Sequence, residues 1–434
     1  MMKLRPFELV LVTVFGLMGL LAVAIVATTE GKPSKTAINL GESVVIWGTV
    51  PAKSFQTVLG PIKEAKKEYE VVTYVEKDIR NFDSDLLNAL AENRGPDIIF
   101  ISHEKLVQLR KKIVPVSYES FPRRDFQNLY IDGAEIFALQ DGVYAYPIAI
   151  DPMVMFYNRD LLATKNIINP PATWESVVND IIPTMVERDY SRNIIRSPLA
   201  FGEYRNINNG FGVLSMLLLQ GGSALVTEQN NSYQLLLNTT PAQTGKPLEN
   251  ALTFYTNFAS PSNPLYSWNR ALNLDRDEFL QEKLVLYFGK GSEGPALAAQ
   301  NPNLNFDVAE VPQGAQATVR RTYASFYGLA LLKSSPNKNG AFTVLQELGT
   351  ANQALVLANA LNMAPAHRST LNAGSNDQYG RITYRSSIVA RGWLNPDPSR
   401  TNDIFTQMVE DVLSNRFRPS DSANDAVSRL SDIY

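Results

Sequence analysis

The sequence predicts an α/β protein built on a parallel sheet. Three short apolar runs, Val44–Trp47, Val71–Val75 and Ile98–Ile101, are separated by two segments with helical spacing of apolar residues. Strands that alternate with helices in this way are typical of parallel sheets. The chain has 434 residues, of which 45% are hydrophobic, so it can bury a large core in about two or three folding units.

Each predicted helix between these strands has a signal at one end. The first carries apolar residues from Phe55 to Tyr69, and Gly60-Pro61 should kink or restart it. The second should begin with Ser84 as its cap and stop at Gly95-Pro96, directly before the third strand. Ligands bind at the carboxyl ends of strands in such sheets, so the residues after Trp47 and after Ile101 are candidates for a site.

The middle of the chain is predicted to be mostly helical, from residue 174 to residue 300. Phe211–Leu219 should form a buried helix closed by Gly221-Gly222, and polar residues 227–247 should form a surface loop. Leu284–Phe288 is expected to be a buried strand. The glycine-rich Gly289–Pro295 after it should be a flexible turn that a ligand can approach.

The last part of the chain mixes both patterns. Phe306–Ala309 and Ser325–Leu331 are predicted strands, and a helix should begin near Ala341. Ile404–Leu413 and Ala423–Leu430 have the spacing of amphipathic terminal helices.

The amino-terminal segment carries a signal for the membrane. Leu9–Ala27 has no charged residue and approaches the roughly 20 residues of a membrane-spanning helix. A cleaved signal peptide is the alternative, but its apolar stretch is shorter, about 7 to 15 residues. Lys3 and Arg5 favour a cytoplasmic amino terminus, so we expect residues 1–28 to be an anchor and residues 29–42 an extracytoplasmic linker.

Composition argues against several functions. The formal net charge of −3 gives no footprint for nucleic acid, and with no cysteine the chain has no disulfide, thiolate metal site or lipid-modified cysteine. Its two histidines, His103 and His367, lie outside any metal-binding motif, and neither a phosphate-binding loop nor a serine-hydrolase elbow occurs. We therefore expect no cofactor, no metal and no enzymatic activity.

Four segments together resemble a known family. Gly95–Phe100, Tyr146–Asp151, Tyr157–Leu161 and Pro170–Trp174 occur in the order and spacing found in the carbohydrate-binding extracellular solute-binding proteins of family 1, the maltose-binding-protein-like branch. The resemblance covers about residues 43–434.

The resemblance implies a two-lobed periplasmic-binding-protein fold of type II with hinge crossings. Lobe 1 would comprise about residues 43–148 and 322–370, and lobe 2 about residues 152–318 and 375–434. Tyr144–Ile150 passes through Asp151-Pro152 into a second apolar run, which we interpret as the first crossing between lobes.

The resemblance also implies ligand contacts in and near the hinge. Asp151 matches an acid that meets the ligand at the hinge, although a carboxylate that caps the following turn would look the same. Ser102 and Glu104 match a stretch that supplies polar contacts, with helix capping and solvent exposure as the alternative.

The remaining candidates combine rings and polar groups. Asn209 and Phe211 correspond approximately to the polar and stacking positions of lobe 2, and Ser292 lies in the turn where a relative offers an aromatic ring. Trp47 is a candidate near the cleft or a core residue. Trp393 is a loop aromatic that either stacks on a ligand or packs on lobe 2.

The family's function follows as an expectation. The chain would capture a sugar or oligosaccharide outside the cytoplasmic membrane and deliver it to the permease of an ABC transporter, closing like a hinge on its ligand. Two alternatives from other classes are an anchored sensor or adhesion protein with the same fold and an extracellular glycosidase with paired carboxylates.

Overall fold

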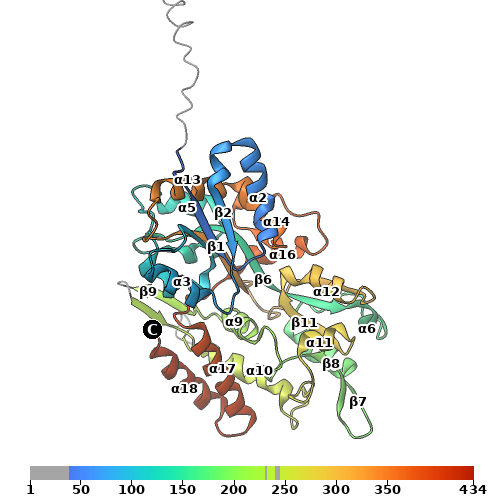
Figure 1. Ribbon diagram of the computed structural model, residues 1–434. Coiled ribbons are helices and arrows are strands. Elements are labelled where there is room, and N and C mark those ends of the chain that lie inside the picture. The colour runs from blue at the N-terminus through green and yellow to red at the C-terminus, as the bar shows by residue number, and fades with distance from the viewer. Residues whose placement is uncertain (1–38, 230–231, 240–244) are drawn as a thin grey trace, which may run out of the picture. The chain divides into compact units, whose positions relative to one another are not determined.

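Two long strands join the two halves of the folded chain. The computed structural model describes residues 39–434 except 230–231 and 240–244. In it, β6 (Tyr146–Asn158) pairs antiparallel with β13 (Thr322–Leu331) through its first half and with β11 (Leu284–Lys290) through its second. The partner changes between Pro152 and Met153, so one sheet continues from the first lobe into the second (Figure 1).

The strands differ widely in length. They are β1 (Val44–Gly48), β2 (Val72–Glu76), β3 (Ile98–Ser102), β4 (Ala138–Leu139), β5 (Gly142–Val143), β6, β7 (Glu187–Arg188), β8 (Ile194–Leu199), β9 (Val226–Gln229), β10 (Ser232–Leu235), β11, β12 (Phe306–Ala309), β13, β14 (Ala364–Pro365) and β15 (Ala390–Arg391).

The helices cover the sheet on both sides. They are α2 (Ala52–Ala65), α3 (Phe82–Ala91), α4 (Leu106–Leu109), α5 (Arg123–Leu129), α6 (Arg159–Ala163), α7 (Trp174–Ser176), α8 (Ile182–Met185), α9 (Gly210–Gln220), α10 (Pro247–Thr256), α11 (Asp275–Leu280), α12 (Gly294–Gln300), α13 (Lys338–Leu348), α14 (Ala351–Ala360), α15 (Arg368–Asn372), α16 (Gly380–Ile388), α17 (Pro398–Leu413) and α18 (Pro419–Ser431).

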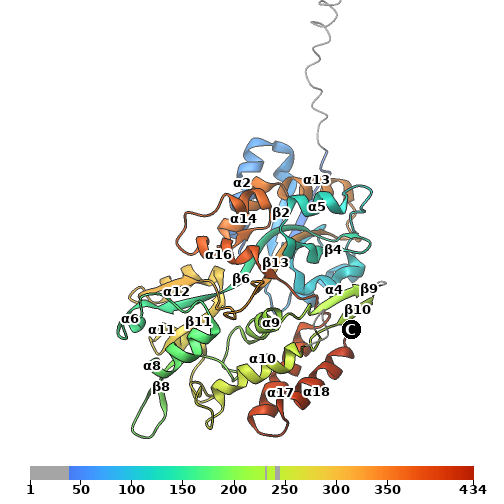
Figure 2. The same cartoon turned by 180° about the vertical axis from the view of Figure 1, so that it is seen from behind.

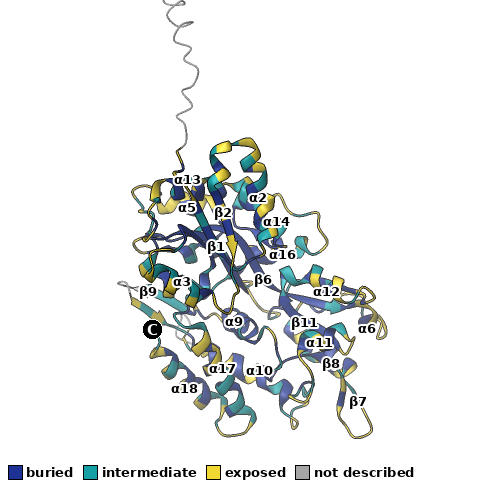
Figure 3. Ribbon diagram, viewed as in Figure 1, coloured by how far each residue is buried: buried dark blue, intermediate teal, exposed yellow. Residues whose placement is uncertain are grey.

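The sheet order defines two lobes. Eleven strands form one sheet whose main path runs β2-β1-β3-β13-β6-β11-β8-β7. We call the part around β1, β2 and β3 lobe 1 and the part around β8, β11 and β12 lobe 2. Hydrophobic clusters fill each lobe separately, and Figure 3 shows the central strands buried beneath helices whose outer faces are exposed.

The predictions for the start of lobe 1 are confirmed. β1, β2 and β3 coincide with the predicted strands to within one residue at each end, and β1 pairs in parallel with both β2 and β3. β3 is buried on both faces, which fits its continuous apolar run, whereas β1 and β2 are more exposed on one face.

Two local predictions in lobe 1 are wrong. Ser84 is not the cap of α3, because the helix begins at Phe82, and Ser84 Oγ donates to the carbonyl of Asn81 at 2.9 Å. Burial of Phe82 explains the earlier start. The restart predicted at Gly60-Pro61 is not found, since the exposed Pro61 lies inside one helix, α2, that Phe55 and Ile62 hold against the core, and the predicted kink there stays a prediction.

Lobe 2 departs further from the predictions. Residues 174–300 contain β7, β8, β9, β10 and part of the main sheet as well as helices, so the mostly helical prediction is wrong. The described part of 227–247 includes a hairpin, β9–β10, where a loop was expected. Gly289–Pro295 is not a flexible turn either, because Gly291–Glu293 forms a 3-10 turn that continues into α12.

Several later predictions hold. β12 and α9 are found as predicted, and Gly221 is the C-cap of α9. The two carboxy-terminal helices are present and pack on each other as α17 and α18.

The predicted anchor at residues 1–28 and most of the linker lie outside the described residues. Within the described part of the chain, no helix is both long and apolar enough to cross a membrane. Residues 40–434 form one compact unit.

Candidate functional site

A polar cavity of about 760 Å³ lies where the lobes meet. Glu104 lines it from lobe 1 and Tyr323 from β13, while Lys290, the start of α9 and one face of α17 line it from lobe 2. Its full lining is Glu104, Tyr204, Arg205, Ile207, Asn208, Asn209, Gly210, Phe211, Gly212, Lys290, Tyr323, Asn402, Asp403, Thr406 and Gln407.

Glu104 is an ionised hydrogen-bond acceptor on the lobe 1 side. It lies in the 3-10 turn His103–Lys105 that follows β3, so the end of a buried strand fixes its position. Its Oε1 accepts hydrogen bonds from Tyr323 OH at 2.8 Å and from Ser325 Oγ at 3.0 Å. Burial alone would raise the pKa of Glu104, but Lys290 and these hydrogen bonds outweigh it and lower the pKa. Among the described residues Oε2 has no partner, so a ligand can donate to it.

Lys290 reaches Glu104 through a serine. Its Nζ donates to Ser325 Oγ at 2.9 Å, and the one proton of that hydroxyl is donated onward to Glu104. Burial lowers the pKa of Lys290, but Tyr327, Glu104 and Asp151 raise it by more, so the net pKa is raised and the ammonium stays charged. One of its three protons is used in this hydrogen-bonded network, and no other acceptor among the described residues takes the remaining two, so they can bind acceptors in the cavity.

His103 fastens the turn that carries Glu104. Its ring lies 3.1 Å from the amide nitrogen of Phe326 and 3.1 Å from that of Trp393. Burial lowers the pKa of His103 to about 4, so the ring is neutral and can accept only one of these bonds at a time. The turn is thereby held by one of these two backbone amides at a time.

The lobe 2 wall presents the open end of α9. Its N-cap residue Asn209 makes no capping bond, and among the described residues the amides of Phe211 and Gly212 have no acceptor. Asn209 instead donates from Nδ2 to Glu293 Oε1 at 3.1 Å, and the same oxygen accepts the backbone N–H of Lys290 at 2.7 Å. Glu293 thus fixes both the start of α9 and the residue that carries the ammonium group.

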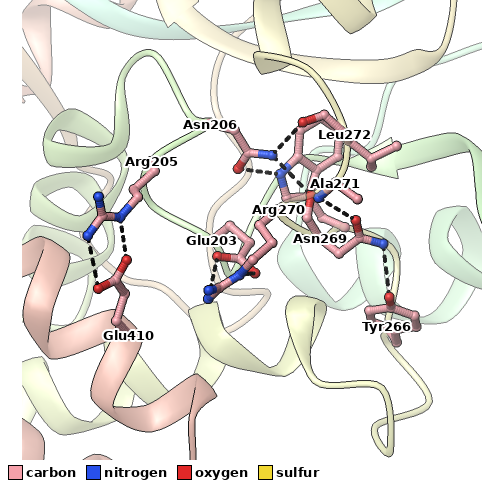
Figure 4. Close-up of polar contacts among 10 residues, drawn as sticks. Glu203, Arg205, Asn206, Tyr266, Asn269, Arg270, Ala271, Leu272 and Glu410 are labelled. Carbon is pink, nitrogen blue, oxygen red and sulfur yellow. Dashed lines mark hydrogen bonds and ion pairs between the residues drawn. The ribbon is translucent and has the colours of Figure 1, made fainter.

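The loop before α9 is held in place by a second network (Figure 4). Asn206 donates to the carbonyls of Asn269 at 3.0 Å and Leu272 at 3.1 Å, and accepts from Trp268 Nε1 at 3.1 Å. Figure 4 also shows Glu203, on the same loop, paired with Arg270 from the segment after Trp268. The loop that leads into α9 is therefore held in place by contacts with residues 268–272.

A stack of rings closes one side of the cavity. Phe211 lies 5.1 Å from Trp393, centroid to centroid, in a stacked arrangement, and 5.6 Å from Tyr323 in an edge arrangement. Trp393 is fully buried and donates from Nε1 to Tyr434 OH at 2.6 Å. Phe211 and Tyr323 both line the cavity, and the buried Trp393 lies behind the partly exposed Phe211.

Three of the predicted site residues line this cavity: Glu104, Asn209 and Phe211. Asp151 and Ser292 contact each other instead, since Asp151 accepts the Ser292 amide at 3.0 Å and its hydroxyl at 2.7 Å.

Trp47, Ser102 and Trp393 do not line the cavity. Trp47 lies under Lys77, whose Nζ is 3.8 Å from the ring centroid, and packs against the lobe 1 core. Ser102 pairs with Tyr327 in the β3–β13 ladder. A role in ligand binding stays a prediction for all eight residues.

Sequence reasoning missed Lys290, Tyr323 and Ser325. Tyr323, Ser325 and Tyr327 lie on one face of β13, and this alternation of polar groups in a buried strand was the available signal. Lys290 ends β11, the position where sheets of this kind bind ligands.

Comparison with solved structures identifies the same fold elsewhere. A cyclo/maltodextrin-binding protein complexed with maltotetraose superposes with a TM-score of 0.71 at 16% identity, covering 93% of this chain and 98% of that one. A maltose-binding periplasmic protein from Listeria monocytogenes in complex with maltose gives 0.69 at 17% identity, covering 90% and 97%. An ABC transporter solute-binding protein from Thermotoga lettingae bound with α-D-tagatose gives 0.67 at 20% identity, covering 91% and 100%.

Sequence relatives point in the same direction. Binding proteins of Brucella abortus strain 2308 and Brucella suis biovar 1 are each 23% identical over 277 residues, or 61% of this chain. The match spans 60% of those relatives' own length. The sequence signature of the bacterial extracellular solute-binding proteins matches residues 50–354. The predicted resemblance is confirmed: this chain belongs to the bacterial extracellular solute-binding protein family.

Proposed function

We propose that this protein binds a sugar or oligosaccharide in the cavity between its lobes. One observation carries the proposal: two hydrogen bonds, from Lys290 to Ser325 and from Ser325 to Glu104, hold a charged donor and an ionised acceptor near each other on the cavity wall. A sugar hydroxyl both donates and accepts hydrogen bonds, so neighbouring hydroxyls can satisfy both groups at once.

The other wall supports the same class of ligand. The open amides of Phe211 and Gly212 can donate to further hydroxyls, and the Phe211 ring offers an apolar face to the C–H side of a sugar. The related structures in complex with maltotetraose, maltose and tagatose support a carbohydrate as the ligand.

Binding would couple to lobe movement. A ligand held by Glu104 from lobe 1 and by α9 from lobe 2 favours the lobe arrangement in which both reach it. We propose that the amino-terminal apolar segment holds the domain at the outer face of the membrane, where an ABC transporter permease accepts the sugar from that arrangement.

Calorimetric titration of the full-length chain in detergent tests the binding step. Maltotetraose, maltose and tagatose are the first probes. We expect saturable binding to a carbohydrate, and Glu104→Gln should weaken it by about tenfold or more because a charged acceptor is lost. Glu347→Gln is the matched control, since Glu347 pairs with Lys66 on the surface of lobe 1. A wild-type affinity for Glu104→Gln would remove the cavity from the proposal.

Transport is tested separately. Cross-linking in the native membrane followed by mass spectrometry should recover an ABC permease. Recovery of a sensor kinase in its place would contradict delivery and favour the sensor alternative.

A further inference from the structure

The β9–β10 hairpin of lobe 2 reaches across to lobe 1. Figure 2 shows it beside α4, far from its own lobe's sheet. Val226 and Leu235 at its base pack against the hydrophobic core of lobe 2. The hairpin is therefore fixed to lobe 2 at its base, while its middle is free to contact the other lobe.

Arg110 of lobe 1 binds this hairpin directly. Its Nη1 donates to Glu228 Oε1 at 2.7 Å and to Tyr233 OH at 3.0 Å, and Nη2 donates to Asp141 Oδ1 at 2.9 Å. Glu228 and Tyr233 face each other across the two strands of the hairpin, whereas Asp141 belongs to lobe 1. One guanidinium thus bridges a carboxylate from each lobe.

Gln140 adds a second set of contacts. Its backbone N–H donates to Glu228 Oε2 at 3.0 Å, and its side-chain Nε2 donates to the Glu228 carbonyl at 3.1 Å. Both carboxylate oxygens of Glu228 are thereby bonded to lobe 1. No residue of this group lines the cavity.

The contact is shielded from solvent. The side chains of Arg110 and Glu228 are 14% and 9% exposed, so salt screens their attraction less than it screens a surface pair. A charge left without its partner in such a place is strongly unfavourable. Any movement that separates the lobes at this point must break these bonds.

We propose that Arg110, Gln140 and Glu228 form a clasp that regulates the ligand cavity by fixing the relative position of the two lobes. The link to ligand affinity rests on the proposed function, because a ligand bound by both lobes gains or loses affinity according to whether the clasp favours the lobe position that binds it. The clasp itself does not depend on any ligand, and its test needs none.

Distance measurements between spin labels test the clasp in the full-length chain without ligand. The chain has no native cysteine, so Glu64→Cys on α2 and Ser399→Cys on α17, both exposed, give one label on each lobe. The background protein should give one dominant distance. Arg110→Gln and Glu228→Gln should each raise the fraction of molecules outside that peak by at least about threefold.

Two comparisons make the result specific. If Arg110 and Glu228 act through their ion pair, the double variant should resemble the single variants, because either single change already breaks that pair. Lys66→Gln is the matched control, since it breaks a 2.7 Å ion pair with Glu347 that lies within lobe 1. Unchanged distances in both single variants, or an equal broadening in Lys66→Gln, would overturn the clasp. Neither result would bear on whether the cavity binds sugar.

Discussion

The two walls of the cavity each contain or rest on a buried carboxyl group, and the pKa values of these groups shift in opposite directions. Glu104 on the lobe 1 wall has a lowered pKa. Asp275, which supports the lobe 2 wall by accepting the backbone N–H of Asn208 at 2.9 Å, has its pKa raised to about 7. Burial is the largest effect on both groups, and it raises the pKa in each case.

Their neighbours account for the difference. Glu104 has the ammonium of Lys290 close by and two side-chain hydroxyl donors. Asp275 accepts backbone bonds from Asn208 and Arg276, and the nearby Glu293 raises its pKa further. The comparison shows that Lys290 and two hydroxyl donors offset the effect of burial on the pKa of Glu104, whereas two amide donors do not offset it at Asp275.

The largest effect on stability is expected when the cation beside Glu104 is removed. Lys290→Met should leave Glu104 buried without a positive neighbour, raise its pKa, and lower the free energy of unfolding by about 3 kcal/mol. Urea denaturation at neutral pH measures the loss. Lys283→Met, an exposed lysine just before the same strand, should change the stability little. Equal stabilities for the two variants would show that Lys290 is not needed to hold Glu104 ionised.

A smaller effect is expected when Asp275 is neutralised. Between pH 3.8 and about 7 native Asp275 keeps its proton while the unfolded chain loses it, so this group makes the wild type less stable as the pH rises through that range. Asp275→Asn removes the penalty and keeps an acceptor for Asn208. The variant should gain about 2 kcal/mol over the wild type at pH 8 and almost nothing at pH 4.

Denaturation curves at both pH values check this expectation. Asp125→Asn, which changes an exposed acid on α5 of lobe 1, serves as the control. A gain for Asp275→Asn that is the same at pH 4 and pH 8 would contradict a raised pKa as its cause.

The smallest effect on stability is expected when Glu104 on the lobe 1 wall loses one hydroxyl donor. Tyr323→Phe removes one of the two donors to Glu104, which should raise its pKa and cost about 1 kcal/mol of stability at neutral pH. Because the pKa of native Glu104 lies below its ordinary value of 4.5, its stabilising contribution is present above that pH and lost as the pH falls. A carboxyl-carbon NMR titration of Glu104 should therefore move to higher pH in the variant, and an unmoved titration would show that the hydroxyl contributes nothing.

The fold of lobe 1 was more predictable than that of lobe 2, for a physical reason. Its first three strands are short apolar runs, of which β3 is buried on both faces, and such runs are visible in the sequence. The β9–β10 hairpin is polar and half exposed, because contacts with the other lobe hold it in place. Nothing in residues 226–235 alone carries that information.

The site was predictable to a similar extent. Glu104 could be found because it directly follows a recognisable buried strand. Lys290 and Ser325 could not, since their roles arise only when β11 and β13 are brought together, and Ser325 is 221 residues from its partner Glu104. Trp393 is conspicuous in sequence as a loop aromatic, yet its ring is covered by lobe 2.

The change of partners along β6 has a mechanical consequence. Both halves of this strand are hydrogen-bonded within the sheet, to β13 on one side of Pro152 and to β11 on the other. Rotation of one lobe against the other must therefore be taken up as added twist of a common sheet, because no free linker exists at that crossing. The β6 amides should then resist hydrogen exchange even while the lobes change their separation, which would separate hinge motion from local unfolding.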